Sequence, residues 1–125
     1  IIVKKMISDL FIDTSVESFP TIRESNGLAL SSRNSYLTKS EKNQASHIYK
    51  MLRLGKNEFQ KDMLKSEDLI NIMTNYLTKN TTITIEYLNI VNHKNLKKVK
   101  EASSNNRILF AGHLNTTRLI DNINL

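Results

Sequence analysis

Thr81-Thr82-Ile83-Thr84-Ile85-Glu86-Tyr87-Leu88-Asn89-Ile90-Val91 is the stretch that decides the fold. It is rich in the β-branched and aromatic residues that favour strands. With a period of two, Ile83, Ile85 and Tyr87 point to one face, whereas Leu88 and Ile90 point to the other. A strand that is apolar on both faces is expected at the centre of a sheet or covered at one end. Residues 81–91 are therefore predicted to form a strand of this kind.

Further strand candidates follow towards the C-terminus. Residues 96–99 are a weaker candidate, and residues 108–114 form a strongly apolar run that residues 117–123 extend after a turn or bend. Asn105-Asn106 suits a tight turn between the last two strands, because asparagine tolerates the backbone conformations of turns. The C-terminal part of the chain is therefore predicted to contain three strands.

Two helices are predicted before these strands. Thr38-Lys39-Ser40-Glu41 forms a capping box, in which the side chains of Thr38 and Glu41 each accept a hydrogen bond from the other residue's amide. Gly55 either ends this first helix or only weakens it, and Ser66 is the predicted cap of the second. Apolar residues at helical spacing give each helix a buried stripe: Ala45, Ile48, Tyr49 and Leu52 in the first helix, and Leu69, Ile70, Met73 and Leu77 in the second.

The order of helix, helix and then three strands predicts an α+β fold with an antiparallel sheet. Ahead of it, the apolar residues of positions 1–11 recur at helical spacing and predict the end of an amphipathic helix. Residues 16–19 are predicted to form a short strand that stops at Pro20, because proline cannot donate to a strand ladder. Residues 20–37 show no period and are expected to form a structured loop.

Composition restricts the classes of function. The chain has 125 residues, enough to bury a core, and 39% of them are hydrophobic, which excludes a disordered composition. No apolar run approaches the roughly 18 residues of a membrane span. The absence of cysteine excludes disulfides, thiol catalysis and a cysteine-based zinc site, and it agrees with a cytoplasmic location. The net charge of +6 favours anionic partners, although scattered lysines also serve solubility alone.

The loop contains one segment with chemistry of its own, Gly27-Leu28-Ala29-Leu30-Ser31-Ser32-Arg33-Asn34. An arginine presents a rigid fork of donors that matches phosphate oxygens. Serine hydroxyls and nearby amides can hold further oxygens, and Gly27 permits backbone conformations that other residues resist. Taken by its chemistry alone, the segment is either a grip for a polyphosphate or a polar turn before a helix.

A longer pattern distinguishes these two interpretations. Pro20-Thr21-Ile22-Arg23, the segment 27–34 and Tyr36-Leu37 together resemble the nucleotide-binding signature of the pantothenate synthetases, also called pantoate–β-alanine ligases. Glu86-Tyr87-Leu88 resembles a strand motif of that family. Thr117-Arg118-Leu119-Ile120-Asp121-Asn122 resembles its C-terminal signature. These matches lie in the family's order and run over nearly the whole chain.

The resemblance implies an ATP-dependent ligase of pantothenate and coenzyme A biosynthesis in the cytoplasm, which joins pantoate to β-alanine through a pantoyl adenylate. ATP and Mg²⁺ would enter together, with no protein ligand assigned to the metal. By resemblance, Ser31, Ser32 and Arg33 would hold the phosphates and stabilise the charge that develops in the transition state. Ile22 and Leu30 would lie near the adenine. Arg23 and Asn34 are expected to support the shape of the loop.

Members of this family are longer and begin with a Rossmann-like nucleotide-binding domain that carries a His-x-Gly-His motif, which this chain lacks. Residues 1–35 are therefore expected to be the C-terminal remnant of that domain, including the phosphate-binding loop, and residues 36–125 a C-terminal lid domain. The chain alone is expected to be inactive without its N-terminal partner domain. The apolar residues of positions 1–11 would then be exposed, and the segment 1–35 is expected to be disordered or to pack on the domain or a second copy. The complete enzyme is expected to form a homodimer through contacts largely outside this chain.

A small basic module that binds an anion or nucleic acid is the alternative interpretation. Lys94, Lys97, Lys98 and Lys100 form the densest basic patch, but no aromatic platform interrupts it, which argues against base stacking. The histidines, His47, His93 and His113, show no metal-ligand spacing and predict no metal site. Glu86 and Asp121 show no pairing in the sequence, so no acid–base role is assigned to them.

Overall fold

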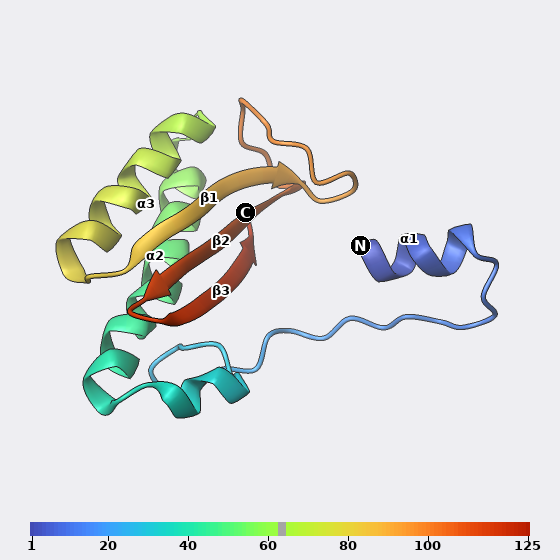
Figure 1. The fold of residues 1–125 in the computed structure, drawn as a ribbon. Helices are drawn as coiled ribbons and strands as arrows, with labels where there is room; N and C mark the ends of the chain where they lie inside the picture. The colour runs from blue at the N-terminus through green and yellow to red at the C-terminus, as the bar shows by residue number, and fades with distance from the viewer. Residues whose placement is uncertain (63–64) are drawn as a thin grey trace.

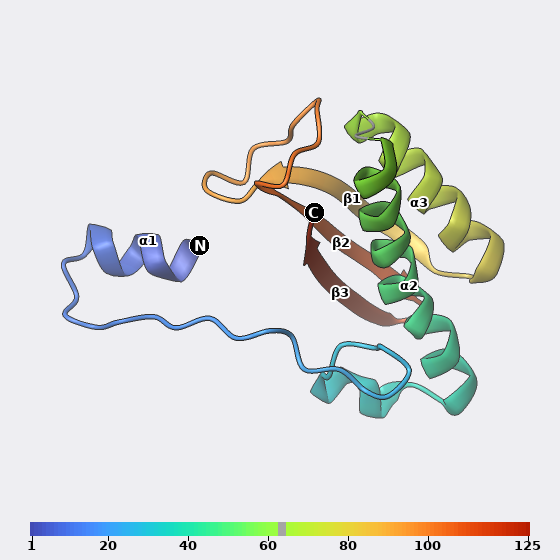
Figure 2. The same cartoon turned by 180° about the vertical axis from the view of Figure 1, so that it is seen from behind.

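The computed structural model describes residues 1–62 and 65–125 and has the predicted α+β architecture (Figure 1). Two long helices, α2 (Lys39–Asp62) and α3 (Ser66–Asn80), cover one face of a three-stranded antiparallel sheet (Figure 2). The strands are β1 (Thr84–Asn92), β2 (Asn106–Leu114) and β3 (Thr117–Asn124), in the order β1-β2-β3. A short helix α1 (Ile2–Asp9) and a 3₁₀ helix η1 (Ser32–Tyr36) precede α2.

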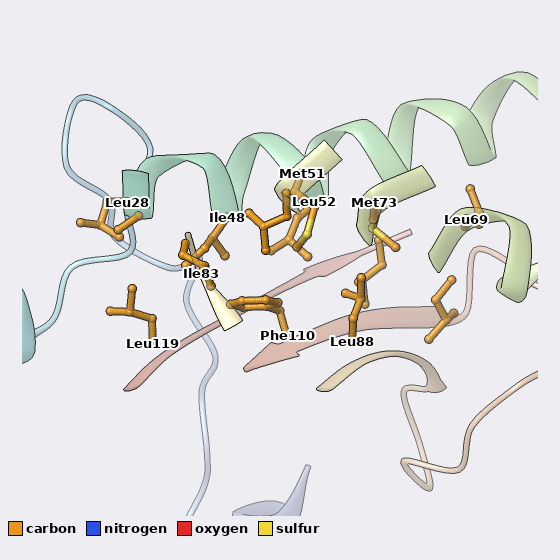
Figure 3. Close-up of a cluster of buried hydrophobic side chains, with 14 of the residues drawn as sticks. Leu28, Ile48, Met51, Leu52, Leu69, Met73, Ile83, Leu88, Phe110 and Leu119 are labelled. Carbon is orange, nitrogen blue, oxygen red and sulfur yellow. The ribbon is translucent and has the colours of Figure 1, made fainter. Parts of the chain in front are cut away.

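The core lies between the two long helices and the sheet (Figure 3). The predicted stripes face the core: Ala45 and Leu52 of α2 and Met73 and Leu77 of α3 are all 0% exposed, while Tyr49 and Ile70 are half-buried. Phe110, in the middle strand, is the largest fully buried side chain among the described residues, at 1% exposure. Burying an apolar side chain of this size contributes about 1.5–3 kcal/mol, so the helix–sheet interface dominates the stability of the fold.

The first helix begins at the predicted capping box. The amide of Thr38 donates to Glu41 Oε2 at 2.7 Å, and the amide of Glu41 donates to Thr38 Oγ1 at 3.3 Å. The helix does not end at Gly55 but continues to Asp62. Gly55 is buried, and a Cβ there would lie 2.4 Å from Met73 Sδ. Glycine therefore serves a close approach of α2 and α3 and not a helix end.

The predicted cap of α3 is wrong by one residue. Lys65 occupies the N-cap position and makes no side-chain capping bond, while Ser66 is the first helical residue. The amide of Ser66 donates to the carbonyl of Lys100 at 3.0 Å, so the connection between β1 and β2 satisfies this helix start in place of a hydroxyl. A tertiary contact has replaced the local cap that the sequence indicates.

Strand β1 contains an irregularity that explains why the sequence pattern assigned its apolar residues to two opposite faces. Ile85 pairs with Gly112 and Tyr87 pairs with Ala111, so Glu86 is an extra residue in the ladder, a β-bulge. The extra residue reverses the alternation. Ile83 before it, and Leu88 and Ile90 after it, consequently belong to the same core cluster, and Ile85 packs against that cluster.

The C-terminal strands differ from the prediction in two places. Residues 96–99 form no strand but only an isolated bridge between Val91 and Lys98, because Leu96 has a φ of 59° that interrupts extended backbone. Residues 117–123 belong instead to a strand of their own, β3. The turn between β2 and β3 is at Asn115-Thr116, with Asn115 at φ 52°. Asn105-Asn106 closes the connection before β2, where Asn106 accepts from Ser103.

The N-terminal arm stands apart from the folded domain (Figures 1 and 2). Helix α1 forms as predicted, but none of its residues is buried. Residues 16–19 form no strand, because no other segment among the described residues pairs with them. Within the described residues, no helix is long and apolar enough to cross a membrane.

Candidate functional site

The segment singled out in the sequence is a short hairpin followed by η1. The amide of Leu30 donates to the carbonyl of Ile22 at 2.9 Å, and the amide of Glu24 donates to the carbonyl of Leu28 at 2.8 Å. Gly27 closes the tip with a φ of 92°, a conformation that side chains with a Cβ resist. The hairpin, residues 22–30, therefore delivers Ser31 at a defined point where the chain turns into η1.

Apolar contacts hold the two ends of this segment on the domain. Leu28 is 4% exposed and Leu37 is 7% exposed, and both belong to the hydrophobic core cluster. Figure 3 shows Leu28 beside the start of α2, near Ile48 and Leu119. The loop is thus part of the same packed body as the helices and the sheet.

Arg23 ties the hairpin to the last strand of the sheet. Its Nη1 donates to Asp121 Oδ2 at 2.7 Å, and its Nη2 donates to Asp121 Oδ1 at 2.9 Å. The same Nη1 also donates to the carbonyl of Gly27 at 3.0 Å. The guanidinium lies 3.7 Å from the ring centroid of Tyr49, a cation–π contact. The Arg23 and Asp121 side chains are 15% and 3% exposed, so the ion pair is largely withdrawn from water.

Asn34 fastens the far side of the loop. Its Nδ2 donates to Glu24 Oε1 at 2.9 Å and to the carbonyl of Ala29 at 3.1 Å, and the residue is only 4% exposed. The supporting role that the sequence suggested for Arg23 and Asn34 agrees with these contacts. Both side chains are engaged in holding the loop, and neither is free to grip a ligand without breaking them.

The residues between these anchors face solvent. Ser31 caps η1 by accepting from the amide of Arg33 at 3.2 Å, while Ser31, Ser32 and Arg33 are all exposed. Among the described residues, the guanidinium of Arg33 has no hydrogen-bond or ion-pair partner. A rigid base therefore carries an arginine whose donors are available to an anion.

A pocket of about 410 Å³ lies between this loop and β3. Of the residues predicted for the site, the pocket brings together Leu30, Ser31 and Arg33. Ser32 and Ile22 are not among its lining residues, and Ile22 is 73% exposed. Leu30 is 62% exposed. The pocket is thus open to solvent, with an apolar rim beside the serine and the arginine.

The pocket is also lined by Arg118, to which the sequence analysis assigned no role. Arg118 of β3 donates through Nε and Nη2 to the carboxylate of Glu86, at 2.7 and 3.0 Å. His113 Nε2 lies 3.4 Å from the same carboxylate. These bonds, led by the one from Arg118, lower the pKa of Glu86. The signal in the sequence was the two-faced pattern of residues 81–91, because the bulge that it reflects places Glu86 beside Arg118.

The remaining candidates have ordinary structural partners. His47 Nδ1 lies 3.0 Å from the hydroxyl of Tyr76, and burial lowers its pKa. His93 Nδ1 lies 2.7 Å from the carbonyl of Asn105. No cluster of three potential metal-binding side chains occurs in residues 1–62 or 65–125. The four lysines of positions 94, 97, 98 and 100 are exposed on the connection between β1 and β2, away from the pocket lining.

Comparisons with known proteins agree on one relationship. The sequence profile described as "Pantoate-beta-alanine ligase" matches residues 1–124. The pantothenate synthetase of Clostridioides difficile is 37% identical over 121 residues, which are 97% of this chain and 43% of that protein. A pantothenate synthetase of Dehalococcoides mccartyi is 38% identical over 98% of this chain and 46% of its own length.

Solved structures show the same likeness. The crystal structure of pantothenate synthetase from Thermus thermophilus superposes with a TM-score of 0.89 at 31% identity, covering 98% of this chain and 44% of that chain. A pantoate-beta-alanine ligase from Francisella tularensis, complexed with beta-gamma ATP and beta-alanine, gives a TM-score of 0.61 at 30% identity, covering 98% of this chain and 38% of its own. This chain spans less than half the length of the curated relatives it matches.

Proposed function

The chain belongs to the pantoate-beta-alanine ligase family, and we propose that it supplies the phosphate-gripping loop and the lid of an enzyme that joins pantoate to β-alanine. In this reaction a carboxylate oxygen of pantoate attacks the α-phosphate of ATP and pyrophosphate leaves. The amine of β-alanine then attacks the acyl carbon of the pantoyl adenylate. A C–N bond forms, the acyl C–O bond breaks, AMP leaves and the amine releases a proton.

The observation that carries the proposal is the exposed Ser31–Arg33 segment on a fixed base beside the pocket. A guanidinium carried on a fixed backbone, with its donors unengaged, can stabilise the negative charge that accumulates on the departing pyrophosphate. The hydroxyls of Ser31 and Ser32 supply further donors. Leu30 and Ile22 offer apolar surface for the adenine, with their backbones joined in the hairpin.

Mg²⁺ enters this scheme as the ion bound to ATP. The carboxylates nearest the loop are already engaged, Asp121 by Arg23 and Glu24 by Asn34. The residues of this chain therefore suit the anionic oxygens of the nucleotide, and the proposal assigns the ion no protein ligand. The ion would neutralise part of the triphosphate charge while Arg33 neutralises another part.

The contacts also bear on where the lid begins. Leu28 packs in the same core as Ile48, and Arg23 bonds to the final strand. These contacts favour a boundary near residue 20, in place of one at residue 35, with the phosphate loop moving as part of the lid. Residues 1–20 would then belong with the preceding nucleotide-binding domain, against which α1 would bury its exposed apolar side chains. The cytoplasmic location and the homodimer are part of the same proposal, as properties of the complete enzyme.

The test is a chimaera in which residues 1–125 replace the matching part of the Clostridioides difficile enzyme. Pyrophosphate release that depends on pantoate and ATP should appear in the chimaera. Arg33→Gln should then lower kcat/KM for ATP by about 100-fold, the loss typical when one preorganised donor to a developing charge is removed. Lys98→Gln, a matched loss of one positive charge from the basic patch, should leave it unchanged. An inactive chimaera that is folded, or an Arg33→Gln chimaera with wild-type kinetics, would contradict the proposal.

The comparisons give no support to a nucleic-acid-binding module. The four lysines that motivated it lie on one exposed connection, and the likeness to ligases covers that connection as well.

A further inference from the structure

The ion pair between Arg23 and Asp121 occupies an unusual position in the loop's support. It is the charged contact that joins the hairpin to β3, across 98 positions of sequence. It is bidentate, and Asp121 Oδ1 additionally accepts from the amide of Asn122 at 2.7 Å. Each carboxylate oxygen of Asp121 thus accepts a bond from the guanidinium of Arg23. Two parallel bonds set the orientation of the guanidinium relative to the carboxylate as well as the distance between them.

The contacts of Arg23 continue directly to the exposed residues of the site. Arg23 pairs with Ala29 across the hairpin. The carbonyl of Ala29 accepts from Asn34 at 3.1 Å. Ser31 and Arg33 lie between Ala29 and Asn34 in the chain. A displacement of Arg23 would therefore pass through the hairpin to both ends of the segment that faces the pocket.

Tyr49 restricts the same hairpin from the helix side. Its ring carries the guanidinium of Arg23 and also lies against Gly27, where a Cβ would approach Tyr49 Cδ1 to 2.7 Å. The hairpin is thus held between a carboxylate on one element and an aromatic ring on another. Such a double constraint is more than burial requires, because Leu28 already anchors the hairpin in the core.

We propose that Arg23 and Asp121 are positioning residues for ATP, which hold Ser31 and Arg33 at the height and angle needed to meet the phosphates. This inference rests on the proposed function of the loop. Neither residue is assigned a contact with the nucleotide. A misplacement on the order of 1 Å can reduce a rate by about 100-fold even when the reacting groups are intact.

Lysine in place of Arg23 separates positioning from charge. Arg23→Lys keeps a cation opposite Asp121 but loses the planar fork, so only one of the two parallel bonds can form. In the chimaera described above, Arg23→Lys should lower kcat/KM for ATP by about 10- to 100-fold, while KM for β-alanine stays within twofold. Asp121→Asn should act in the same direction, and the double variant should lose little more than either single variant.

Leu77→Ala is the matched control, because Leu77 is fully buried in α3 and is not among the residues that line the pocket. It should lower the melting temperature at least as much as Arg23→Lys and leave the kinetics for ATP unchanged. Equal effects of Leu77→Ala and Arg23→Lys on kcat/KM for ATP would overturn the inference. If Arg33→Gln left kcat/KM for ATP unchanged, the proposed function itself would fail. If Arg33→Gln lowered kcat/KM for ATP and Arg23→Lys did not, only the positioning role would fail.

A second measurement uses the 125-residue chain alone and needs no activity. Hydrogen exchange at the amides of Glu24 and Leu30, which close the hairpin, should be at least 10-fold faster in Arg23→Lys than in the wild type, the ratio expected when a contact of about 1.4 kcal/mol is lost. Amides in α3 should keep their wild-type rates. Unchanged exchange at both hairpin amides would show that Leu28 alone fixes the loop and would overturn the inference.

Discussion

Asn115 Nδ2 donates to Glu41 Oε1 at 2.6 Å, which joins the turn between β2 and β3 to the first turn of α2. The other carboxylate oxygen of Glu41 accepts from the amide and the hydroxyl of Thr38. One side chain therefore closes the capping box and also fastens the hairpin of the sheet to the helix. The start of α2 is consequently a junction between local and tertiary structure.

The first prediction concerns this junction. Thr38→Ala removes the hydroxyl that caps α2 and should lower the free energy of unfolding by about 1 kcal/mol. Chemical denaturation followed by circular dichroism measures the change. Ser40→Ala, an exposed substitution in the same turn, should stay within about 0.5 kcal/mol of the wild type. Equal effects of the two substitutions would show that the cap contributes nothing specific.

Acidification should destabilise the domain through Glu41 and Glu86. The pKa of Glu41 is lowered first by its backbone hydrogen bond with Thr38, and the pKa of Glu86 first by Arg118. A carboxyl group with a lowered folded-state pKa stabilises the fold above its unfolded pKa, about 4.3, and loses that contribution as the pH falls through the folded value. The melting temperature should therefore decline below about pH 4.3.

The matched variants for this pH dependence are Glu41→Gln with Glu86→Gln, and Glu17→Gln. The melting temperature of the double variant should fall less between pH 5 and pH 3 than that of the wild type, because two of the groups that take up protons on unfolding are gone. Glu17 is exposed on the N-terminal arm, and its replacement should leave the profile as it is. A double variant with the wild-type slope would be the contrary result.

Gly55→Ala tests the close approach of the two helices. Alanine favours a helix over glycine by about 1 kcal/mol, but its Cβ would meet Met73 Sδ at 2.4 Å. Overpacking of a core costs typically about 1–3 kcal/mol, so a net loss of stability on the order of 1 kcal/mol is expected. In a Met73→Ala background the obstacle is absent, and the same substitution should stabilise. A stabilising effect in both backgrounds would show that Met73 simply moves aside.

Deletion of Glu86 tests the purpose of the bulge. Without the extra residue, β1 becomes a regular strand with strict alternation. One of its faces still carries Ile83, Ile85, Leu88 and Ile90. The sheet should form, with a near-native circular dichroism spectrum, while Arg118 loses its carboxylate. Deletion of Asn89, in the regular part of β1, should instead turn Ile90 away from the core and unfold the domain. Similar outcomes for the two deletions would contradict this interpretation.

The sequence predicted the parts of the fold that local patterns determine. The capping box, both apolar stripes and the strongest strands lie where expected, because each depends on neighbours a few positions apart. The strand expected at residues 96–99 was wrong, since Leu96 takes a φ of 59°. Ser66 was wrong as a cap, because the carbonyl of Lys100 bonds to the helix start. The first error comes from a local turn, in which the amide of Leu96 donates to the carbonyl of Asn92. The second comes from a long-range contact that no local pattern reveals.

The site was predictable in its residue types and not in its support. Leu30, Ser31 and Arg33 line the pocket as a group. The partners of Arg23 and Arg118 could not be inferred, since Asp121 and Glu86 are distant in sequence and only the folded sheet brings each carboxylate to its arginine. Pairing of this kind depends on strand register, which a bulge of one residue can change.

The ion pair between Arg23 and Asp121 also has a consequence during synthesis of the protein on the ribosome. A ribosome that adds about 5–20 residues per second makes Asp121 some seconds after Arg23. Throughout that interval the hairpin has its own backbone bonds but lacks the carboxylate that fixes it. The loop that would receive ATP is therefore synthesised well before the carboxylate that sets it in place.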